Sequence, residues 1–170
     1  MMNRSEVDNL HLKDSFRQAD IPGKIAIILS IWFGAGLFPG VPGTVGTLAT
    51  LPLVLGMGYL GIWVRALVLV IALAVAIWAS GRCEELLNRS DPSEIVIDEV
   101  AGFLLTMFLL PLSWLNLVLG FVLFRFFDIL KPFPIRLFEQ LRGGLGIVMD
   151  DLMAGIYAYL AVRMILFLVF

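Results

Sequence analysis

Charged side chains stand at the ends of apolar segments, at spacings that could support chemistry. Arg125, Asp128 and Lys131 are three residues apart at the end of an apolar run, and positions three apart share one face of a helix. Asp150 and Asp151 are adjacent and follow a glycine-rich stretch. A charge at the centre of a membrane helix costs roughly 2.5–3.5 kcal/mol, and such residues often mark binding sites or ion pathways. We therefore expect these side chains to have a function or to lie where water reaches them.

Another acidic pair, Asp98 and Glu99, follows a strong helix-start signal. The segment Asp91-Pro92-Ser93-Glu94 has an N-cap residue, a proline at the first helical position and a glutamate at capping-box spacing. It predicts a helix that runs to Leu110, with Asp91 and Glu94 as capping residues. Asp98 and Glu99 come after the first turn, where capping does not explain them. We therefore assign this pair a function.

The composition indicates an integral membrane protein. Of the 170 residues, 60% are hydrophobic and 15% are charged, and the mean hydropathy is +0.96. Soluble domains are about 45–50% apolar and about 25% charged. A net charge of −2 without a basic block argues against nucleic acid as a partner. We expect a polar cytoplasmic leader over residues 1–22 and one membrane-embedded domain over residues 23–170.

The apolar segments predict an all-α, polytopic membrane bundle. Residues 25–37 are too short to cross and predict a re-entrant or interfacial helix. Five spans are expected at residues 44–61, 64–80, 97–110, 114–130 and 152–170, with Thr44 as the N-cap of the first. Of the twelve Lys and Arg residues, only Arg65 and Arg163 then lie toward the far side, so the polar loops face the cytoplasm. Every polar segment therefore meets at one membrane face.

Four of these polar segments resemble the bacterial phosphatidylglycerophosphatase A family. They are PGTVGTL at 42–48, IVIDEVAG at 95–102, FRFFDILKPFPIR at 124–136 and GLGIVMDDLMAG at 144–155, in the order that the family has them. The resemblance implies a magnesium-dependent lipid phosphatase of the bacterial inner membrane, with its active site facing the cytoplasm. It would convert phosphatidylglycerol phosphate into phosphatidylglycerol and phosphate, within phospholipid biosynthesis.

The residue types support that chemistry. Magnesium prefers hard oxygen ligands, usually one or two carboxylates together with water and a substrate phosphate. The candidate catalytic carboxylates are Asp98, Glu99, Asp128, Asp150 and Asp151, and all of these except Asp128 are also candidate metal ligands. Positive charge for the phosphate can come from the candidate substrate-binding residues Arg125, Lys131 and Arg136. Backbone N–H groups near Thr44, Gly46 and Thr47 would form an anion site at a helix start.

Several alternatives stay open at this point. Metal-activated water is the preferred nucleophile, while an aspartyl-phosphate on Asp150 or Asp151 is the other route. His11 lies in the polar leader and Cys83 has no phosphate loop after it, which argues against histidine and cysteine phosphatases. A small ion or solute transporter is the main rival function, and a cytidine-nucleotide-dependent lipid transferase is another. A homo-oligomer also stays open.

Overall fold

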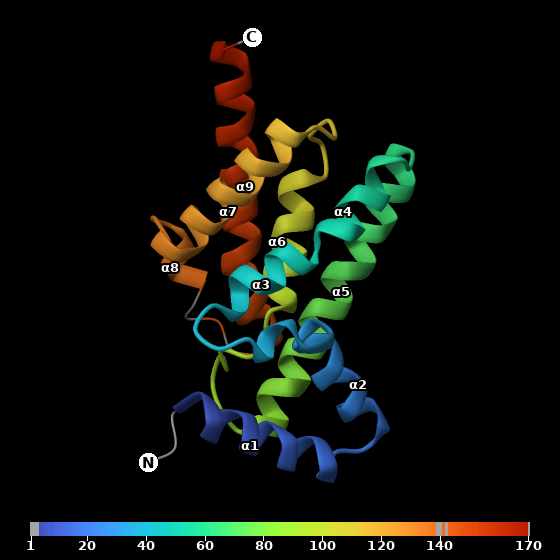
Figure 1. The fold of residues 1–170 in the computed structure, drawn as a ribbon, viewed down its shortest axis with the longest axis vertical. Coiled ribbons are helices and arrows are strands. Elements are labelled where there is room, and N and C mark those ends of the chain that lie inside the picture. Colours follow the sequence, from blue (N-terminus) through green and yellow to red (C-terminus); the bar gives the residue numbers. More distant parts are fainter. Residues whose placement is uncertain (1–3, 139–140, 142, 170) are drawn as a thin grey trace.

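The computed structural model describes residues 4–138, 141 and 143–169, which form helices joined by loops. In chain order the elements are α1 (Arg4–Gln18), α2 (Ile21–Ser30), the 3-10 helix η1 (Trp32–Leu37), α3 (Pro42–Ala49), α4 (Leu51–Gly58), α5 (Ile62–Leu87), α6 (Ile97–Met107), α7 (Trp114–Leu130), α8 (Ile135–Phe138) and α9 (Gly144–Val169). The described residues contain no strand, which confirms the all-α class. Figure 1 shows α1 and α2 at one end of the long axis and the C-terminal part of α9 at the other.

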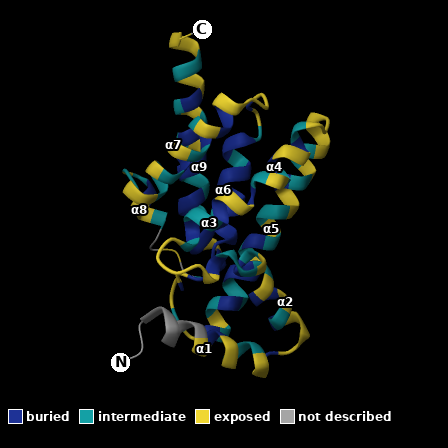
Figure 2. Ribbon diagram, in the orientation of Figure 1, coloured by how far each residue is buried: buried dark blue, intermediate teal, exposed yellow. Residues whose placement is uncertain are grey.

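Helix α6 forms the centre of the fold and is buried along almost its whole length (Figure 2). A helix that is apolar all round is stable only when other elements enclose it, and α6 packs against α9, α5, α7 and α3. A Cβ atom on Gly102 would lie 2.6 Å from the backbone oxygen of Asp151. The Thr106 hydroxyl lies 3.0 Å from the oxygen of Gly102 and 3.3 Å from that of Gly155. Small residues therefore let α6 and α9 approach closely, which brings Asp151 beside α6.

Of the described helices, only α5 and α9 are long and apolar enough to cross a membrane, which corrects the expected five spans. Each has 26 residues. Helix α6 has 11 residues and is therefore only about 16 Å long, against a bilayer core of about 30 Å. The expected span 44–61 is divided into α3 and α4 at Thr50. Pro52 is the second residue of α4, and proline cannot donate the backbone hydrogen bond that a continuous helix needs.

The start of α6 also differs from the prediction. The helix begins at Ile97 rather than at Asp91, which has a positive φ of 46°. The Glu94 carboxylate lies 3.0 Å from Arg89 rather than capping the segment. The backbone N–H of Val96 donates to a carbonyl of α2 at 2.8 Å. These contacts, together with a turn in which the N–H of Ile95 donates to the oxygen of Pro92, form a loop where the local signal predicts a helix.

Of the other helix boundaries predicted from the sequence, some agree with the structure and some differ from it. Helix α7 has the predicted bounds, and Ser113 caps it by accepting a hydrogen bond from the Asn116 N–H at 3.2 Å. Helix α3 begins at Pro42, so Thr44 lies inside the helix and is not its N-cap. The segment expected as one re-entrant or interfacial helix at residues 25–37 forms α2 and η1, with positive φ at Phe33.

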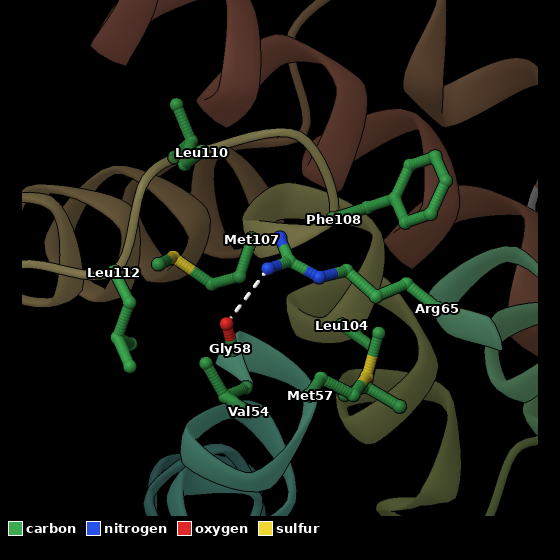
Figure 3. A pocket seen from close by; sticks show the side chains of 9 residues that line it. All are labelled: Val54, Met57, Gly58, Arg65, Leu104, Met107, Phe108, Leu110 and Leu112. Atoms are coloured by element: carbon green, nitrogen blue, oxygen red, sulfur yellow. Dashed lines mark hydrogen bonds between the residues drawn. The ribbon is translucent and has the colours of Figure 1, made fainter. Parts of the chain in front are cut away.

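Arg65 completes the turn between α4 and α5 (Figure 3). Its Nε donates to the oxygen of Leu60 at 2.9 Å, and its Nη2 donates to the oxygen of Gly58 at 2.8 Å. Carbonyls at the end of a helix lack intrahelical partners, so the guanidinium satisfies the end of α4. The adjacent cavity of about 10 Å³ has room for about one water molecule. This arginine therefore has a structural role.

Candidate active site

An open cavity of about 460 Å³ lies where the start of α3, the loop before α6 and the adjoining ends of α6, α7 and α9 meet. Its lining contains nearly all of the charged residues that the sequence singled out, namely Asp98, Glu99, Arg125, Asp128, Lys131, Asp150 and Asp151. These residues come from three separate stretches of the chain. The structure thus brings the predicted acids and bases together in one place.

Three carboxylates in this cavity lie close enough to share one cation. Asp98 and Glu99 are on the first turn of α6, and Asp151 is on α9. One carboxylate oxygen from each lies within 4.8 Å of the other two. Within the described part of the chain, Asp98 Oδ1 and Glu99 Oε2 are buried without a hydrogen-bond partner. Unpaired buried carboxylate oxygens are costly, so this arrangement is well suited to hold a cation.

Burial and mutual repulsion make the acidic pair on α6 hard to ionise. Burial, followed by the neighbouring Glu99 charge, raises the pKa of Asp98 well above its usual range. Burial, followed by the charge of Asp151, raises the pKa of Glu99 to about 8. Both residues lie outside α5 and α9, the two helices that are candidates for crossing the membrane. A bound cation would favour the ionised forms of both carboxylates.

Two cations flank the carboxylates, and each is held by an acid. Arg125 Nη1 lies 2.6 Å from Asp128 Oδ2, on the same face of α7, and 3.6 Å from Glu99 Oε1. Lys131, which ends α7 with a left-handed backbone, places its Nζ 2.6 Å from Asp150 Oδ2. Asp150 Oδ1 also accepts the backbone N–H of Asp151 at 3.0 Å. The cavity therefore has an acidic part and a part that carries fixed positive charge.

Gly43 lets α3 approach both parts of the site. A Cβ atom at this position would collide with Glu99 Oε1 and would lie 2.9 Å from Arg125 Nη1. Because Pro42 has no N–H, the first backbone donors of α3 are those of Gly43 and Thr44. Both residues line the cavity. The start of α3 can therefore present N–H groups to an anion there.

Some predicted site residues are placed elsewhere. Thr47 is fully buried and donates its hydroxyl hydrogen bond to the oxygen of Gly43 at 2.8 Å, and a Cβ on Gly46 would lie 2.8 Å from Val96. Arg136 is exposed, and its Nη2 lies 3.5 Å from the oxygen of Leu130. Among the described residues, none of these three lines the cavity. Gly46 and Thr47 were predicted to bind substrate because the helix start was expected two residues too late. Arg136 was predicted from its charge alone.

Asp150 occupies a different place from the one its prediction as a metal ligand implies. The group of three carboxylates found among the described residues does not include it. Its two oxygens are instead within hydrogen-bonding distance of Lys131 Nζ and of the Asp151 N–H. Asp150 is therefore placed to hold Lys131, while its assignment as a ligand stays a prediction.

Sequence reasoning missed Gly43, Asp91 and Ser93 as lining residues of the cavity. Gly43 follows Pro42, and a proline at the first helical position was the available signal for where α3 begins. Asp91 and Ser93 were explained as helix-start residues, and no local signal indicates that they lie on a loop beside the site. Only tertiary packing places them there.

Comparison with known proteins identifies the family of this chain. The family model Phosphatidylglycerophosphatase A matches residues 28–166. A phosphatidylglycerophosphatase A of Escherichia coli is 37% identical over 131 residues, covering 76% of this chain and 76% of that protein. One from Haemophilus influenzae is 38% identical over 138 residues, covering 79% and 85%.

A further relative has a different name. A Bacteroides thetaiotaomicron protein, named provisionally as a phosphatidylinositol-3-phosphatase, is 31% identical over 149 residues, covering 83% of this chain and 93% of that protein. No solved structure matches the chain significantly. The matched region contains all of the acidic and basic residues that line the cavity. The chain belongs to the phosphatidylglycerophosphatase A family.

Proposed function

We propose that this protein is a phosphatidylglycerophosphatase, which hydrolyses the terminal phosphate of phosphatidylglycerol phosphate. One observation carries the proposal: the carboxylates of Asp98, Glu99 and Asp151 share a cavity with Arg125 and Lys131. Hydrolysis of a phosphomonoester needs positive charge around the phosphate oxygens, since negative charge is distributed over them in the transition state. The names of the Escherichia coli and Haemophilus influenzae relatives support this substrate.

The acidic group fits a magnesium ion. Asp98, Glu99 and Asp151 supply hard oxygen donors, and their oxygens are close enough to reach one ion. The unpartnered oxygens of Asp98 and Glu99 noted above are available as ligands. The bound ion would supply positive charge to the phosphate and to the leaving-group oxygen.

The remaining residues of the cavity have separate roles in this proposal. Arg125 and Lys131 bind the phosphate oxygens, and the N–H groups of Gly43 and Thr44 add donors at the start of α3. Asp128 and Asp150 each hold one of the two cations in position. A carboxylate of the cavity would also accept the proton that the attacking water loses. No histidine or cysteine is needed for this reaction.

The membrane arrangement follows from α5 and α9. We propose that both helices cross the inner membrane of a bacterium as part of a helical bundle and that α3, α4, α6 and α7 pack along them. The C-terminal part of α5 adjoins the start of α9, because a Cβ on Gly81 would lie 3.0 Å from the nitrogen of Gly144. The cavity lies at this end, where most of the lysines and arginines are. From the positive-inside rule we propose that the site faces the cytoplasm, on the same side of the membrane as α1.

Phosphate release from purified protein in detergent micelles tests the proposal. We expect phosphate from phosphatidylglycerol phosphate in the presence of magnesium, and none from the Asp151→Asn variant. Phosphatidylinositol 3-phosphate should be compared in the same assay, because the Bacteroides relative is named for that substrate. Faster turnover of the inositol lipid would change the substrate but keep the reaction. No release from either lipid would reject the phosphatase and favour the transporter.

A further inference from the structure

The lining of the charged cavity includes exposed apolar side chains. Val41, just before α3, is 50% exposed, and Ile129, in the last turn of α7, is 70% exposed, yet both line the cavity. Their neighbours in sequence include further exposed apolar side chains, of which Phe133 is 81% exposed. We call Phe38, Val41, Ile129, Leu130 and Phe133 the apolar lip. Of these residues, Val41 and Ile129 line the cavity, whose other lining residues are mostly charged or polar.

Apart from Gly40, the other exposed lining residues have the opposite character. Asp91 and Ser93 are polar and belong to the loop before α6. The exposed part of the lining is therefore polar on the loop before α6 and apolar on two other segments, the loop before α3 and the end of α7. Exposed apolar side chains that line a binding cavity indicate contact with another molecule or with a membrane. Their position beside a phosphate-sized charged site limits what that molecule can be.

We propose that the apolar lip is the surface over which a membrane phospholipid reaches the cavity and on which its glycerol backbone and first acyl carbons rest. The occupant must carry a phosphate for Arg125 and Lys131 and apolar chains for Val41 and Ile129, and a phospholipid with a terminal phosphate combines both. The inference rests on the proposed function and deepens it. A water-soluble phosphomonoester would fill the charged part of the cavity and leave the lip unused.

Substitutions in the apolar lip test whether the lip binds the acyl part of the lipid while the charged part of the cavity binds the phosphate. Val41→Thr keeps the side-chain shape, and Ile129→Asn keeps approximately the size, while both remove apolar contact. We expect each to raise KM for long-chain phosphatidylglycerol phosphate in vesicles by about tenfold, from the lost burial of apolar surface. The kcat for the long-chain lipid, and kcat/KM for the deacylated, water-soluble phosphate ester, should stay within about twofold of the unaltered protein.

Ile21→Asn is the matched control, because Ile21 on α2 is 75% exposed and is not among the described residues that line the cavity. It should leave both substrates unchanged. An unchanged KM for the vesicle lipid in both lip variants would overturn the proposal. An equal loss on the acylated and deacylated substrates would also overturn it, since the lip would then act on the charged site itself.

A photo-crosslink separates this inference from the proposed function. A phospholipid with a terminal phosphate and a diazirine near the start of one acyl chain should label peptides containing Val41 or Ile129, even in the inactive Asp151→Asn variant. Excess unlabelled phosphatidylglycerol phosphate should suppress the labelling. Labelling confined to the outer faces of α4 and α5 would contradict the lip. Absence of phosphate release together with labelling at the lip would reject only the phosphatase activity.

Discussion

Lys131 Nζ lies 2.6 Å from Asp150 Oδ2, so the two residues form an ion pair across the cavity between the end of α7 and the start of α9. This pair gives the adjacent aspartates Asp150 and Asp151 different surroundings. Asp151 faces the carboxylates of α6, whereas Asp150 faces a cation. Substitution of Asp150 and substitution of Asp151 should therefore change different properties of the protein, although the two residues are adjacent and of the same type.

The first prediction concerns that difference. Asp150→Asn should raise KM for the lipid by about tenfold or more, because Lys131 loses the charged partner that positions it, with little change in apparent magnesium affinity. Lys131→Ala should also raise KM and lower kcat/KM while expression and membrane insertion stay normal. Initial rates across lipid and magnesium concentrations check both. A large loss of magnesium affinity in Asp150→Asn would instead make Asp150 a metal ligand.

The metal group is the subject of the second prediction. Asp98→Asn and Asp151→Asn keep size but remove a ligand charge, so each should lower kcat by roughly a hundredfold or more and weaken magnesium binding. Removal of magnesium with a chelator should abolish activity, and calcium should restore it poorly because it prefers longer bonds. Calorimetric titration with magnesium measures binding without turnover. Glu85→Gln is the control, since Glu85 is exposed and pairs with Arg82 outside the cavity. Full activity in excess chelator would contradict the metal site.

The third prediction uses the close approach of α3. Gly43→Ala introduces a Cβ that collides with Glu99 and crowds Arg125, so activity should fall by roughly tenfold or more, as small displacements of catalytic groups cost this much. Gly56→Ala is the matched control, because a Cβ there meets nothing within 4 Å. Gly56 is also helical, so alanine there should be neutral or slightly stabilising. Activity and Tm should be measured for both variants. If Gly43→Ala lowered Tm along with activity, the loss would reflect destabilisation of the fold rather than displacement of Glu99 and Arg125.

Labelling of engineered cysteines checks the orientation. Cys83, the single cysteine of the sequence, is fully buried and should react slowly. A cysteine at Ser93 should be protected from a membrane-impermeant maleimide in intact cells and react after the cells are opened. A cysteine at Tyr59, at the turn between α4 and α5, should react from outside. The reverse pattern would place the cavity on the outer side of the membrane.

Sequence reasoning predicted which charged residues lie together better than it predicted the helices that carry them. Asp98, Glu99, Asp128 and Asp151 were recognisable because ionised groups in apolar segments are costly and need a reason to be there. The start of α6 was not recognisable, since the competing contacts of Glu94 and Val96 involve partners outside the helix. Local capping signals carry no information about such partners.

Sequence reasoning also failed to predict the number of membrane-spanning helices and the glycine that lies at the site. Apolar composition does not distinguish a helix that lipid surrounds from one that protein surrounds, and α6 is of the second kind. Gly46 was chosen over Gly43 because Thr44 was assumed to start the helix. The packing of α3 against α6 decides which glycine lies next to Glu99. This packing involves segments far apart in the sequence, so local signals do not reveal it.

The contact of Gly102 with the backbone of Asp151 also bears on how the protein responds to its bilayer. Membranes differ in thickness, and a long helix accommodates a mismatch by tilting. Helix α9 is exposed to such changes, but α6 is enclosed by its neighbours and held against α9 at backbone distance. The two helices should therefore tilt as one body and keep the spacing of Asp98, Glu99 and Asp151. The site should consequently tolerate lipids of different chain length, and activity should vary little between short-chain and long-chain bilayers.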